Sequence, residues 1–479
     1  MIVMKFGGSS VESAVAIQRV ASIVAAHRHR HPVVVVSAMG KTTNRLLAIG
    51  KHTAHGDRPA AAQGLRELKD YHWTEATQAV AAEDLPALSA FLDTHFAELE
   101  GELDRVAENG EMPYDLTDSI CAFGERLSSA IVTLAFRRAG LDAVHVDSRT
   151  VIITDSRHTQ AHPLYSRTYS RLKEVVAPLA ENQVVVMGGF IGSSADGITT
   201  TLGRGGSDFT ASIVGAGIDA EEIQIWTDVD GMLTCDPRIL PGGHRVKTIS
   251  FAEAAELAFF GAKVLHPFTV LPAIDKNIPV LILNSRHPER EGTRIVAETV
   301  PSLNPVKAIA CKANVTVVNV RSARMLMAYG FLHRIFEVFD RYRTPVDVIT
   351  TSEVSVSLTI ESLDHLDDIR ADLERIAEIS VEKDQASISL VGENVRGTAG
   401  IAGRTFGALR NINIRMISQG ASLLNLTLVV DAADLKEAVE RLHTEFFTEL
   451  DPLVFDTSQR KVQTGVPLCP DPTAQRSHN

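Results

Sequence analysis

Cysteine is scarce in this sequence of 479 residues, which contains only Cys121, Cys235, Cys311 and Cys469. These cysteines are far apart and form no CxxC pair, which excludes a disulfide-built scaffold and a zinc ribbon. Basic residues are also in deficit, because 47 Lys and Arg against 59 Asp and Glu give a formal net charge of -12. A general nucleic-acid binder needs a basic face to neutralise phosphates. We therefore predict no nucleic-acid partner, although a small anionic substrate remains compatible with a few local cations.

The sequence also lacks an uninterrupted apolar run long enough to cross a bilayer, so we predict no membrane partner. Its first residues, MIVMKFGGSS, show neither a signal peptide nor a transit peptide. Together with the cysteine pattern, which suits a reducing compartment, this predicts a cytoplasmic protein.

Several common catalytic motifs are absent as well. Gly40-Lys41-Thr42 has the ending of a Walker A motif, but Val35 stands where its first glycine belongs. No GxGxxG follows the first expected strand, which weakens a nicotinamide-binding interpretation. Neither HExxH nor GxSxG occurs, so the metalloprotease and serine-hydrolase patterns are excluded.

What the first 300 residues do contain is an alternation of short apolar runs with helical stretches. The runs typical of buried parallel strands are 2–6, 32–37, 142–146, 151–154, 183–187, 223–226 and 278–283. Ser9 and Glu12 have the spacing of a capping box that would start a helix after the first run, and residues 44–110 are expected to be helical. We predict an α/β domain over 1–300, with a doubly wound, mainly parallel sheet and a ligand site at the carboxyl ends of its strands.

After residue 300 the pattern repeats with a period of 68 residues. Val346 corresponds to Ile414, Ile349 to Ile417 and Leu358 to Leu426. Chance similarity is the alternative, but the apolar positions stay in register over a long stretch. The repeat predicts two α+β domains, over 310–385 and 386–450, with a strand near 450–460 completing the first. The polar, proline-containing residues 461–479 are expected to form a flexible tail.

Two glycine-rich turns have the composition of anion-binding loops. In the first, KFGGSS (5–10), a strand leads into Gly7 and Gly8, next to Lys5. In the second, residues 199–210 place Arg204 among glycines just before an expected helix. Glycine amides and helix N-termini bind anions, and arginine suits a carboxylate. The alternatives are a tight turn with an exposed lysine and a flexible hairpin tip with a surface arginine.

Taken in order, six segments resemble the aspartate kinases of the amino acid kinase family. They are KFGGSS (5–10), SAMGKTTN (37–44), FGERLS (123–128), GFIGSSADGITTTLGRGGSDFT (189–210), WTDVDGMLTCDPR (226–238) and FGAKVLHP (260–267). The repeat resembles the paired ferredoxin-like ACT domains of that family, above all at 346–360 and 413–422. The resemblance covers about residues 1–460. It points to the monofunctional, lysine-sensitive type, since the chain is too short for the homoserine dehydrogenase domain of bifunctional relatives.

The resemblance implies transfer of the γ-phosphate of ATP, with Mg²⁺, to the β-carboxylate of L-aspartate, the first step toward lysine, threonine and methionine. It implies that Lys5 neutralises the transferred phosphoryl group and that Asp208 orients the reacting groups. The substrate-binding residues would be Ser37, Thr43, Glu125, Arg204 and Ser207, with Arg204 on the α-carboxylate and Glu125 on the α-ammonium. The nucleotide-binding residues would be Lys5, Gly7, Gly8, Ser9, Thr227, Asp228, Leu233, Arg238, Lys263 and Val264. Leu233 stands where related sequences often place a tyrosine against the adenine. No metal site formed by protein ligands is expected.

The same resemblance implies feedback inhibition by L-lysine and a homodimer, or a dimer of dimers, formed through the ACT domains. The effector site would consist of Met325, Gly330, Phe331, Leu332, Pro345, Val346, Asp347, Thr351, Ser352 and Glu353. Asp347 would bind the effector ammonium. Pro345 replaces a small polar residue common in lysine-sensitive relatives, and proline has no amide hydrogen to donate.

Two other functions are compatible with parts of this pattern. One is an amino-acid kinase acting on glutamate or N-acetylglutamate, against which Glu125 argues because it suits a free α-ammonium. The other is a non-catalytic ACT-type amino-acid sensor. The presence of Lys5, Arg204, Asp208 and Lys263 argues against this second alternative.

Overall fold

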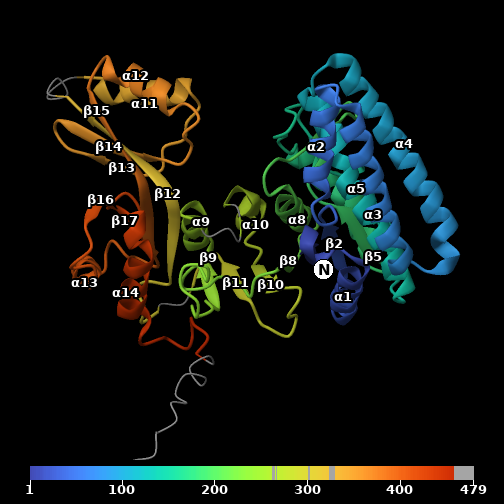
Figure 1. Ribbon diagram of the computed structural model, residues 1–479. Helices are drawn as coiled ribbons and strands as arrows, with labels where there is room; N and C mark the ends of the chain where they lie inside the picture. The colour runs from blue at the N-terminus through green and yellow to red at the C-terminus, as the bar shows by residue number, and fades with distance from the viewer. Residues whose placement is uncertain (262–264, 266, 300–301, 323–328, 458–479) are drawn as a thin grey trace, which may run out of the picture.

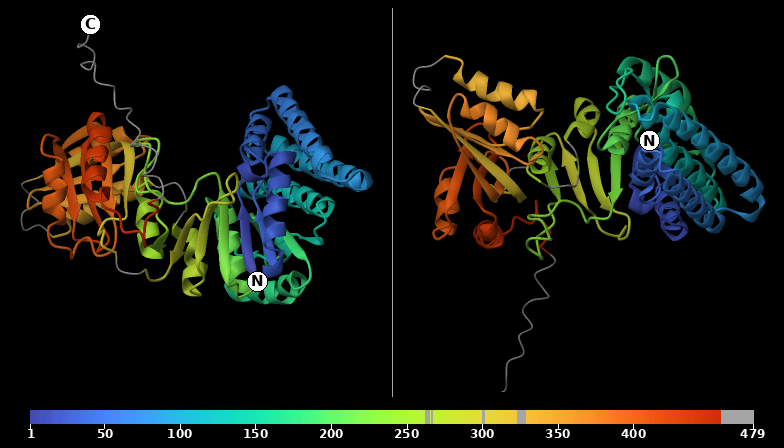
Figure 2. Two further views of the ribbon diagram at one scale, coloured as in Figure 1. Left: turned by 90° about the horizontal axis from the view of Figure 1, so that it is seen from below. Right: turned by 45° about the horizontal axis from the view of Figure 1, so that its top comes forward.

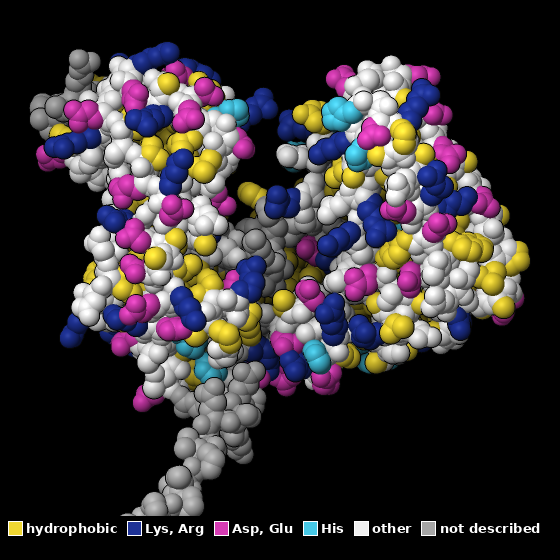
Figure 3. All heavy atoms as spheres, viewed as in Figure 1, with side chains coloured by type: hydrophobic (Ala, Val, Ile, Leu, Met, Phe, Trp, Pro, Cys, Tyr) yellow, Lys and Arg dark blue, Asp and Glu magenta, His cyan; other side chains and the backbone are white. Residues whose placement is uncertain are grey.

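The computed structural model describes residues 1–261, 265, 267–299, 302–322 and 329–457. The chain forms an N-terminal part up to residue 299 and a C-terminal part from residue 302 (Figure 1). The two parts lie side by side in all three ribbon views, and the middle of the chain lies between them (Figure 2). Figure 3 shows acidic and basic side chains interspersed over one face, with a hollow between the two parts.

An eight-stranded sheet forms the centre of the N-terminal part, in the order β3-β5-β2-β1-β8-β10-β11-β9. Its strands are β1 (Ile2–Phe6), β2 (Pro32–Val36), β3 (Ala143–Val146), β5 (Val184–Gly188), β8 (Glu222–Thr227), β9 (Thr248–Ser250), β10 (Val280–Asn284) and β11 (Thr293–Val296). All neighbouring strands are parallel except β10 and β11. A smaller sheet contains β4 (Ile153–Thr154), β6 (Ile191–Ser194) and β7 (Thr199–Thr201). The predicted mainly parallel α/β fold is confirmed.

Both faces of the large sheet are buried, which explains its uninterrupted valine runs. Val33 and Val35 belong to one hydrophobic cluster, and Val34 and Val36 belong to the other. The helices on the face of Val34 are α1 (Ala14–Ala26), α2 (Thr42–Ala54), α3 (Arg58–Ala79), α4 (Leu85–Asn109) and α5 (Tyr114–Arg138). Those on the other face are α6 (Tyr165–Arg171), α7 (Ala177–Ala180), α8 (Gly206–Gly217), α9 (Phe251–Phe259) and α10 (Leu271–Asp275).

Helix α5 is the one helix among the described residues that is long and apolar enough to cross a membrane. Within the fold, 83% of its apolar window is buried. This burial is typical of the core helix of a globular domain, and α5 packs between the sheet and helices α2 to α4.

The predicted capping box at Ser9 and Glu12 is wrong. Residues Gly8–Ser10 form a short 3-10 turn, and α1 begins only at Ala14, where the side chain of Ser13 accepts a hydrogen bond from the backbone of Ala16. The chain does not enter the helix at Ser9 because the preceding turn is fixed by a contact from outside it. The carbonyl of Gly8 accepts a hydrogen bond from the backbone N–H of Gly40 (3.0 Å). The helix therefore starts one turn later than the capping-box spacing predicts.

The C-terminal part is built on a six-stranded antiparallel sheet in the order β13-β14-β12-β15-β17-β16. Its strands are β12 (Ala308–Arg321), β13 (Ile349–Thr351), β14 (Ser355–Ile360), β15 (Glu378–Val391), β16 (Ile414–Gln419) and β17 (Asn425–Asp431). Its helices are α11 (Phe331–Arg341), α12 (Leu366–Glu374), α13 (Ile401–Ala408) and α14 (Leu435–Phe447). The order strand, helix, two strands, helix occurs twice, as the repeat predicts. The exact domain boundaries stay a prediction.

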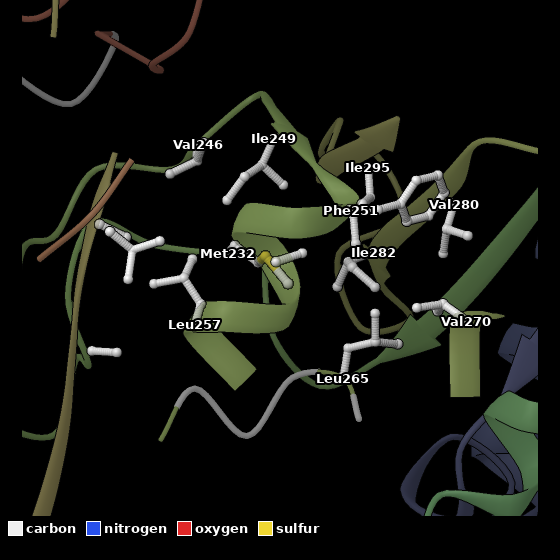
Figure 4. Close-up of a cluster of buried hydrophobic side chains, with 14 of the residues drawn as sticks. Met232, Val246, Ile249, Phe251, Leu257, Leu265, Val270, Val280, Ile282 and Ile295 are labelled. Atoms are coloured by element: carbon white, nitrogen blue, oxygen red, sulfur yellow. The ribbon is translucent and has the colours of Figure 1, made fainter. Parts of the chain in front are cut away.

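The chain returns to the N-terminal part after α14. The backbone N–H of Lys247 donates to the carbonyl of Val454 (2.7 Å), and Val246 forms a β-bridge with Phe455. Val454 and Phe455 are buried in a cluster that also contains Val246 and Leu257, both of which are labelled in Figure 4. Residues 454–456 therefore pair with the N-terminal part instead of joining the six-stranded sheet.

A buried ion pair also joins the two parts. Lys307, just before β12, places its Nζ 3.0 Å from Oε2 of Glu253 on α9, and both side chains are essentially inaccessible to solvent. Lys307 also donates to the hydroxyl of Thr299 (2.9 Å). Removing one partner of a buried pair leaves the other as an uncompensated charge.

We expect the substitution Lys307→Met to destabilise the protein by about 3–5 kcal/mol, because it leaves the Glu253 carboxylate buried without its cation. Urea unfolding followed by circular dichroism measures this. The matched control is Arg370→Met, which removes an exposed pair with Glu374 on α12 and should change stability by less than about 0.5 kcal/mol. Equal, small effects of both substitutions would contradict a structural role for the buried pair.

Candidate active site

The end of the central strand β1 carries an ion pair. Lys5 is the penultimate residue of β1, and its Nζ lies 2.6 Å from Oδ1 of Asp208 in the first turn of α8. Both side chains are largely buried. The pair joins the first glycine-rich turn to the helix that follows the second, so these two segments, about 200 residues apart, form one site.

The turn after β1 requires glycine at position 8. A Cβ on Gly8 would lie 2.8 Å from the carbonyl oxygens of Ala38 and Gly40, which is too close for any side chain. The amide of Gly7 donates to the carbonyl of Trp226 at the end of β8 (3.2 Å). The turn therefore lies flat against the ends of the neighbouring strands, where its backbone can approach a ligand.

Glu125 is the most unusual titratable group of this region. It lies in the middle of α5 and is fully buried, and its Oε1 accepts a hydrogen bond from the backbone N–H of Ala38 (3.1 Å). Its Oε2 is buried and has no hydrogen-bond partner among the described residues. Burial raises the pKa of the Glu125 carboxyl to about 8. A buried carboxylate oxygen without a partner suits a cationic ligand group.

These groups surround a cavity of about 310 Å³. Its lining residues are Lys5, Gly8, Ser37, Ala38, Gly40, Thr43, Glu125, Phe190, Gly203, Gly205, Gly206, Ser207 and Asp208. Gly203 and Gly205, on either side of Arg204, line the cavity. The Arg204 side chain itself is exposed and forms no ion pair within the described part of the chain. The fold thus gathers the expected substrate-binding residues, apart from this side chain.

A second cavity of about 450 Å³ lies between the segment after β8 and strand β12. Asp228, Leu233 and Arg238 line it, together with Leu257 and residues 308–311 of β12 in the six-stranded sheet. Thr227 ends β8, and its hydroxyl donates to Oδ1 of Asp228 (3.2 Å). Because β1 and β8 are neighbouring parallel strands, both cavities lie at their carboxyl ends.

The other residues expected to bind the nucleotide lie at separate places in the chain. Gly7 and Ser9 flank Gly8 in the turn after β1. The Arg238 guanidinium is exposed and pairs with Asp236, which raises the pKa of Arg238 above its usual range. Lys263 and Val264 lie outside the described residues. Within the described ranges, no group of three or more His, Cys, Asp or Glu side chains could hold a metal ion.

The described residues among those expected at an effector site lie at the start of helix α11 and in or on either side of strand β13. Gly330, Phe331 and Leu332 start α11, and Met325 lies outside the described residues. Pro345, Val346 and Asp347 precede β13, Thr351 is its last residue, and Ser352 and Glu353 begin the exposed turn to β14. The hydroxyls of Ser352 and Ser355 are hydrogen-bonded to each other in this turn (2.7 Å).

Asp347 already has a cationic partner within the chain. Nζ of Lys312, on β12, lies 3.1 Å from Oδ2 of Asp347 and also contacts Glu361. Burial raises the pKa of the Asp347 carboxyl, and the neighbouring Lys312 opposes that shift. The Lys312 ammonium also lies 4.9 Å from the centre of the Phe259 ring on α9. This cation–π contact joins the six-stranded sheet to the N-terminal part.

Some lining residues were missed by sequence reasoning. Phe190 and the backbone of Ala38 line the first cavity, and Ile309 and Cys311 line the second. Phe190 and Ala38 lie inside the segments that carried the resemblance, so their neighbourhood could have been found. Nothing in the local sequence of β12 indicates that it faces the segment after β8.

Comparisons with known proteins agree with this arrangement. Residues 1–284 match the amino acid kinase family, and residues 388–446 match the ACT domain. Aspartokinase 2, chloroplastic, of Arabidopsis thaliana is 37% identical over 466 residues, which cover 94% of this chain and 85% of that protein. The crystal structure of E. coli aspartokinase III in complex with lysine and aspartate (T-state) has a TM-score of 0.81 at 33% identity and covers 93% of this chain and 99% of that one. The structure of E. coli aspartokinase III in complex with aspartate and ADP (R-state) has a TM-score of 0.79 at 33% identity and covers 93% and 100%.

The similarity extends over both parts of the molecule. The ion pair at the end of β1, the buried Glu125 and both cavities involve the region that matches the amino acid kinase family. Strands β16 and β17 and helix α14 lie in the region that matches the ACT domain. The chain therefore belongs to the aspartokinases, enzymes of the amino acid kinase family with C-terminal ACT domains.

Proposed function

We propose that the smaller cavity binds L-aspartate and the larger cavity the base of ATP, and that the γ-phosphate passes to the β-carboxylate to give 4-phospho-L-aspartate. The observation that carries this assignment is Glu125, which lines the same cavity as Lys5 and has one buried carboxylate oxygen without a hydrogen-bond partner in the described part of the chain. A free α-ammonium satisfies that oxygen, which favours aspartate over an N-acetylated substrate. The product would then enter the biosynthesis of lysine, threonine and methionine.

At the substrate end, Glu125 holds the α-ammonium and Arg204 the α-carboxylate. Arg204 can do this after its exposed side chain turns toward the cavity that Gly203 and Gly205 line. Its planar guanidinium suits a carboxylate because it offers two parallel N–H donors. Ser37, Thr43 and Ser207 line the same cavity, and their hydroxyls are further donors that help to place the substrate.

At the reacting end, the chemistry joins two anions, so positioning and charge neutralisation dominate. Lys5 brings its ammonium to the phosphoryl group from the end of β1. Asp208 holds Lys5 in that direction through their 2.6 Å ion pair and so orients the reacting groups. The backbone amides of Gly8 and Ser9 are donors for phosphate oxygens, and Gly7 positions this turn through its own hydrogen bond to the carbonyl of Trp226.

At the nucleotide end, Leu233 packs against the adenine through its apolar side chain, and Thr227, Asp228 and Arg238 hold the rest of the nucleotide. Support comes from the shared position of Asp228, Leu233 and Arg238 around the second cavity and from the ADP in an E. coli relative. Lys263 and Val264 complete this set in the proposal. Mg²⁺ would supply charge neutralisation at the phosphates, since it usually binds substrate phosphates, water and one or two carboxylates. The carboxylates that line the two cavities are Glu125, Asp208, Asp228 and Asp236, and of these Asp208 and Asp228 would hold the ion.

For regulation, we propose L-lysine as the feedback inhibitor and Asp347 as the residue that binds its ammonium. An E. coli relative was solved with lysine bound. The partners of Asp347 add a condition, because Lys312 already neutralises this carboxylate. The effector ammonium must therefore displace Lys312, and its binding would shift the population between two states of the enzyme.

A homodimer formed through the ACT domains is part of the proposal. Strands β13 and β16 are the outer strands of the six-stranded sheet and lie next to each other, because the hydroxyl of Thr350 donates to the carbonyl of Ile417 (3.1 Å). Ile349 and Ile417 on them are exposed, and apolar side chains of this kind are what a contact between two copies would cover. A cytoplasmic location stays a prediction, since the Arabidopsis relative is named chloroplastic.

We expect the purified protein to release ADP from Mg-ATP only when L-aspartate is present, and Lys5→Met to lower kcat by about 100-fold or more because the transferred phosphoryl group loses its cation. A coupled ADP assay measures both. The control is Lys51→Met on α2, an exposed lysine outside both cavities, which should keep kcat within about twofold. Release with glutamate or N-acetylglutamate but not aspartate would reassign the substrate, and no release with any of them would favour a sensor.

The KM for L-aspartate should fall as the pH rises through about 8, because the free enzyme must deprotonate Glu125 to bind an ammonium. The raised pKa means that the carboxyl is neutral below this range and charged above it. In the variant Glu125→Gln, KM should rise about tenfold or more and this pH dependence should disappear. Lys5 and Asp208 line the same cavity as Glu125. The pH dependence of KM for ATP is therefore measured as well, so that effects on the nucleotide are separated from those on aspartate. An unchanged aspartate profile in the variant would contradict the proposed role of Glu125.

Removing the internal competitor should make the enzyme more sensitive to its effector. We expect Lys312→Met to lower the lysine concentration for half-inhibition about tenfold, because the Asp347 carboxylate is then left without a nearby ammonium. Lys383→Met, at an exposed position of the neighbouring strand β15, is the control. A higher or unchanged concentration would contradict the competition, whereas inhibition of both proteins by threonine alone would reassign the effector.

A further inference from the structure

The first observation concerns Asp118, a carboxylate that has no part in the chemistry described above. It lies on α5 and is fully buried. Its Oδ1 accepts a hydrogen bond from the hydroxyl of Thr201 (2.5 Å), and both of its oxygens accept from the backbone N–H of Thr159 (3.0 Å). Nδ1 of His158 lies 2.9 Å from Oδ2. Asp118 on α5 thus binds both the loop at residues 158–159 and the end of strand β7.

The second observation is that one of these loops is held in a strained conformation. Thr159 has a positive φ of 68°, which is rare for a β-branched residue. The backbone N–H of Thr159 donates its hydrogen bonds to both carboxylate oxygens of Asp118. The carbonyl of Thr159 faces Gly203, where an added Cβ would lie only 3.1 Å away. The conformation that Asp118 stabilises therefore forms a wall against the glycine-rich loop.

The third observation is the path from Asp118 to Arg204. Thr201 ends β7, and its carbonyl accepts a hydrogen bond from the backbone N–H of Ala161 (2.9 Å) in the strained loop. Three residues after Thr201 comes Arg204, between glycines that line the substrate cavity. Asp118 therefore fixes the start of the loop that carries Arg204, although it does not line the cavity itself.

The fourth observation is that the same helix carries the other end of the substrate site. Glu125 follows Asp118 on α5 after seven residues, which is two helical turns and about 10 Å along one face. One rigid element thus positions the carboxylate that faces the cavity and the anchor of the glycine-rich loop.

We propose that Asp118 is a positioning residue that sets the distance between Glu125 and the loop of Arg204, and thereby selects a four-carbon amino dicarboxylic acid over its homologue with one more methylene. This rests on the proposed roles of Glu125 and Arg204. A fixed spacing discriminates by length, because a substrate that is one carbon longer then brings its reacting carboxylate to a different place. A looser spacing weakens the binding of aspartate and tolerates the longer homologue better.

The test is the kinetics of Asp118→Asn, with L-aspartate and L-glutamate as substrates. Asparagine keeps the shape but has one acceptor oxygen, so the hydrogen bonds to Thr201 and Thr159 are not all retained. We expect KM for L-aspartate to rise about tenfold and the preference for aspartate over glutamate in kcat/KM to fall by a similar factor. KM for ATP should stay within about twofold, since the second cavity does not contact this cluster.

Two further variants make the outcome decisive. Thr201→Val removes one donor to Asp118 with little change in volume and should shift the same two quantities in the same direction. Asp115→Asn makes the same chemical change one turn earlier on α5, at a half-buried position with no hydrogen bond to the loop among the described residues, and should shift neither.

A lower thermal midpoint with unchanged KM for aspartate and unchanged preference, in both Asp118→Asn and Thr201→Val, would overturn the proposal and leave Asp118 a structural residue. Failure of the proposed function has a different signature. In that case Arg204→Lys and Glu125→Gln would themselves leave KM for aspartate unchanged, whatever the behaviour of Asp118→Asn.

Discussion

The ion pair between Lys5 and Asp208 is the interaction on which the site depends. It joins the end of the central strand to the start of α8, so that two loops far apart in sequence face one cavity. An enzyme with a net charge of -12 must still bring an anionic amino acid to an anionic nucleotide. Lys5 lies beside a glycine turn in a cavity partly shielded from water, where a positive charge acts most strongly on an anionic ligand. Its ion pair with Asp208 fixes the direction of the Lys5 side chain.

The six-stranded sheet of the C-terminal part forms part of the second cavity. Residues 308–311 of β12 form one wall of the second cavity, and the backbone N–H of Ile309 donates to the carbonyl of Thr234 (2.8 Å). The hydroxyl of Thr234 also lies 2.8 Å from Nε2 of His443 on α14, where burial lowers the pKa of the imidazole to about 4. A shift of the sheet relative to the N-terminal part therefore changes the shape of the cavity directly, without a chain of intermediate contacts.

The sequence was informative where local patterns have a fixed physical meaning. Valine runs predicted the buried parallel strands, the 68-residue period predicted the repeated α+β units, and glycines near Lys5 and Arg204 predicted backbone that approaches a ligand. It was uninformative where the meaning depends on distant contacts. The capping-box spacing mispredicts the start of α1 because Gly8 is hydrogen-bonded to Gly40 across the turn. No local pattern indicates the role of Asp118, because its partners lie 40 or more residues away in the sequence.

The return of residues 451–456 to the N-terminal part has a consequence for how this enzyme is made. Val454 and Phe455 fill the cluster around Val246 and Leu257, next to the wall of the second cavity. Because a chain emerges from the ribosome from its N-terminus, these two side chains become available only after the entire six-stranded sheet has been translated. The N-terminal part therefore completes this region of its core only after the C-terminal sheet has been made, and a product truncated before residue 451 lacks part of the packing beside the second cavity.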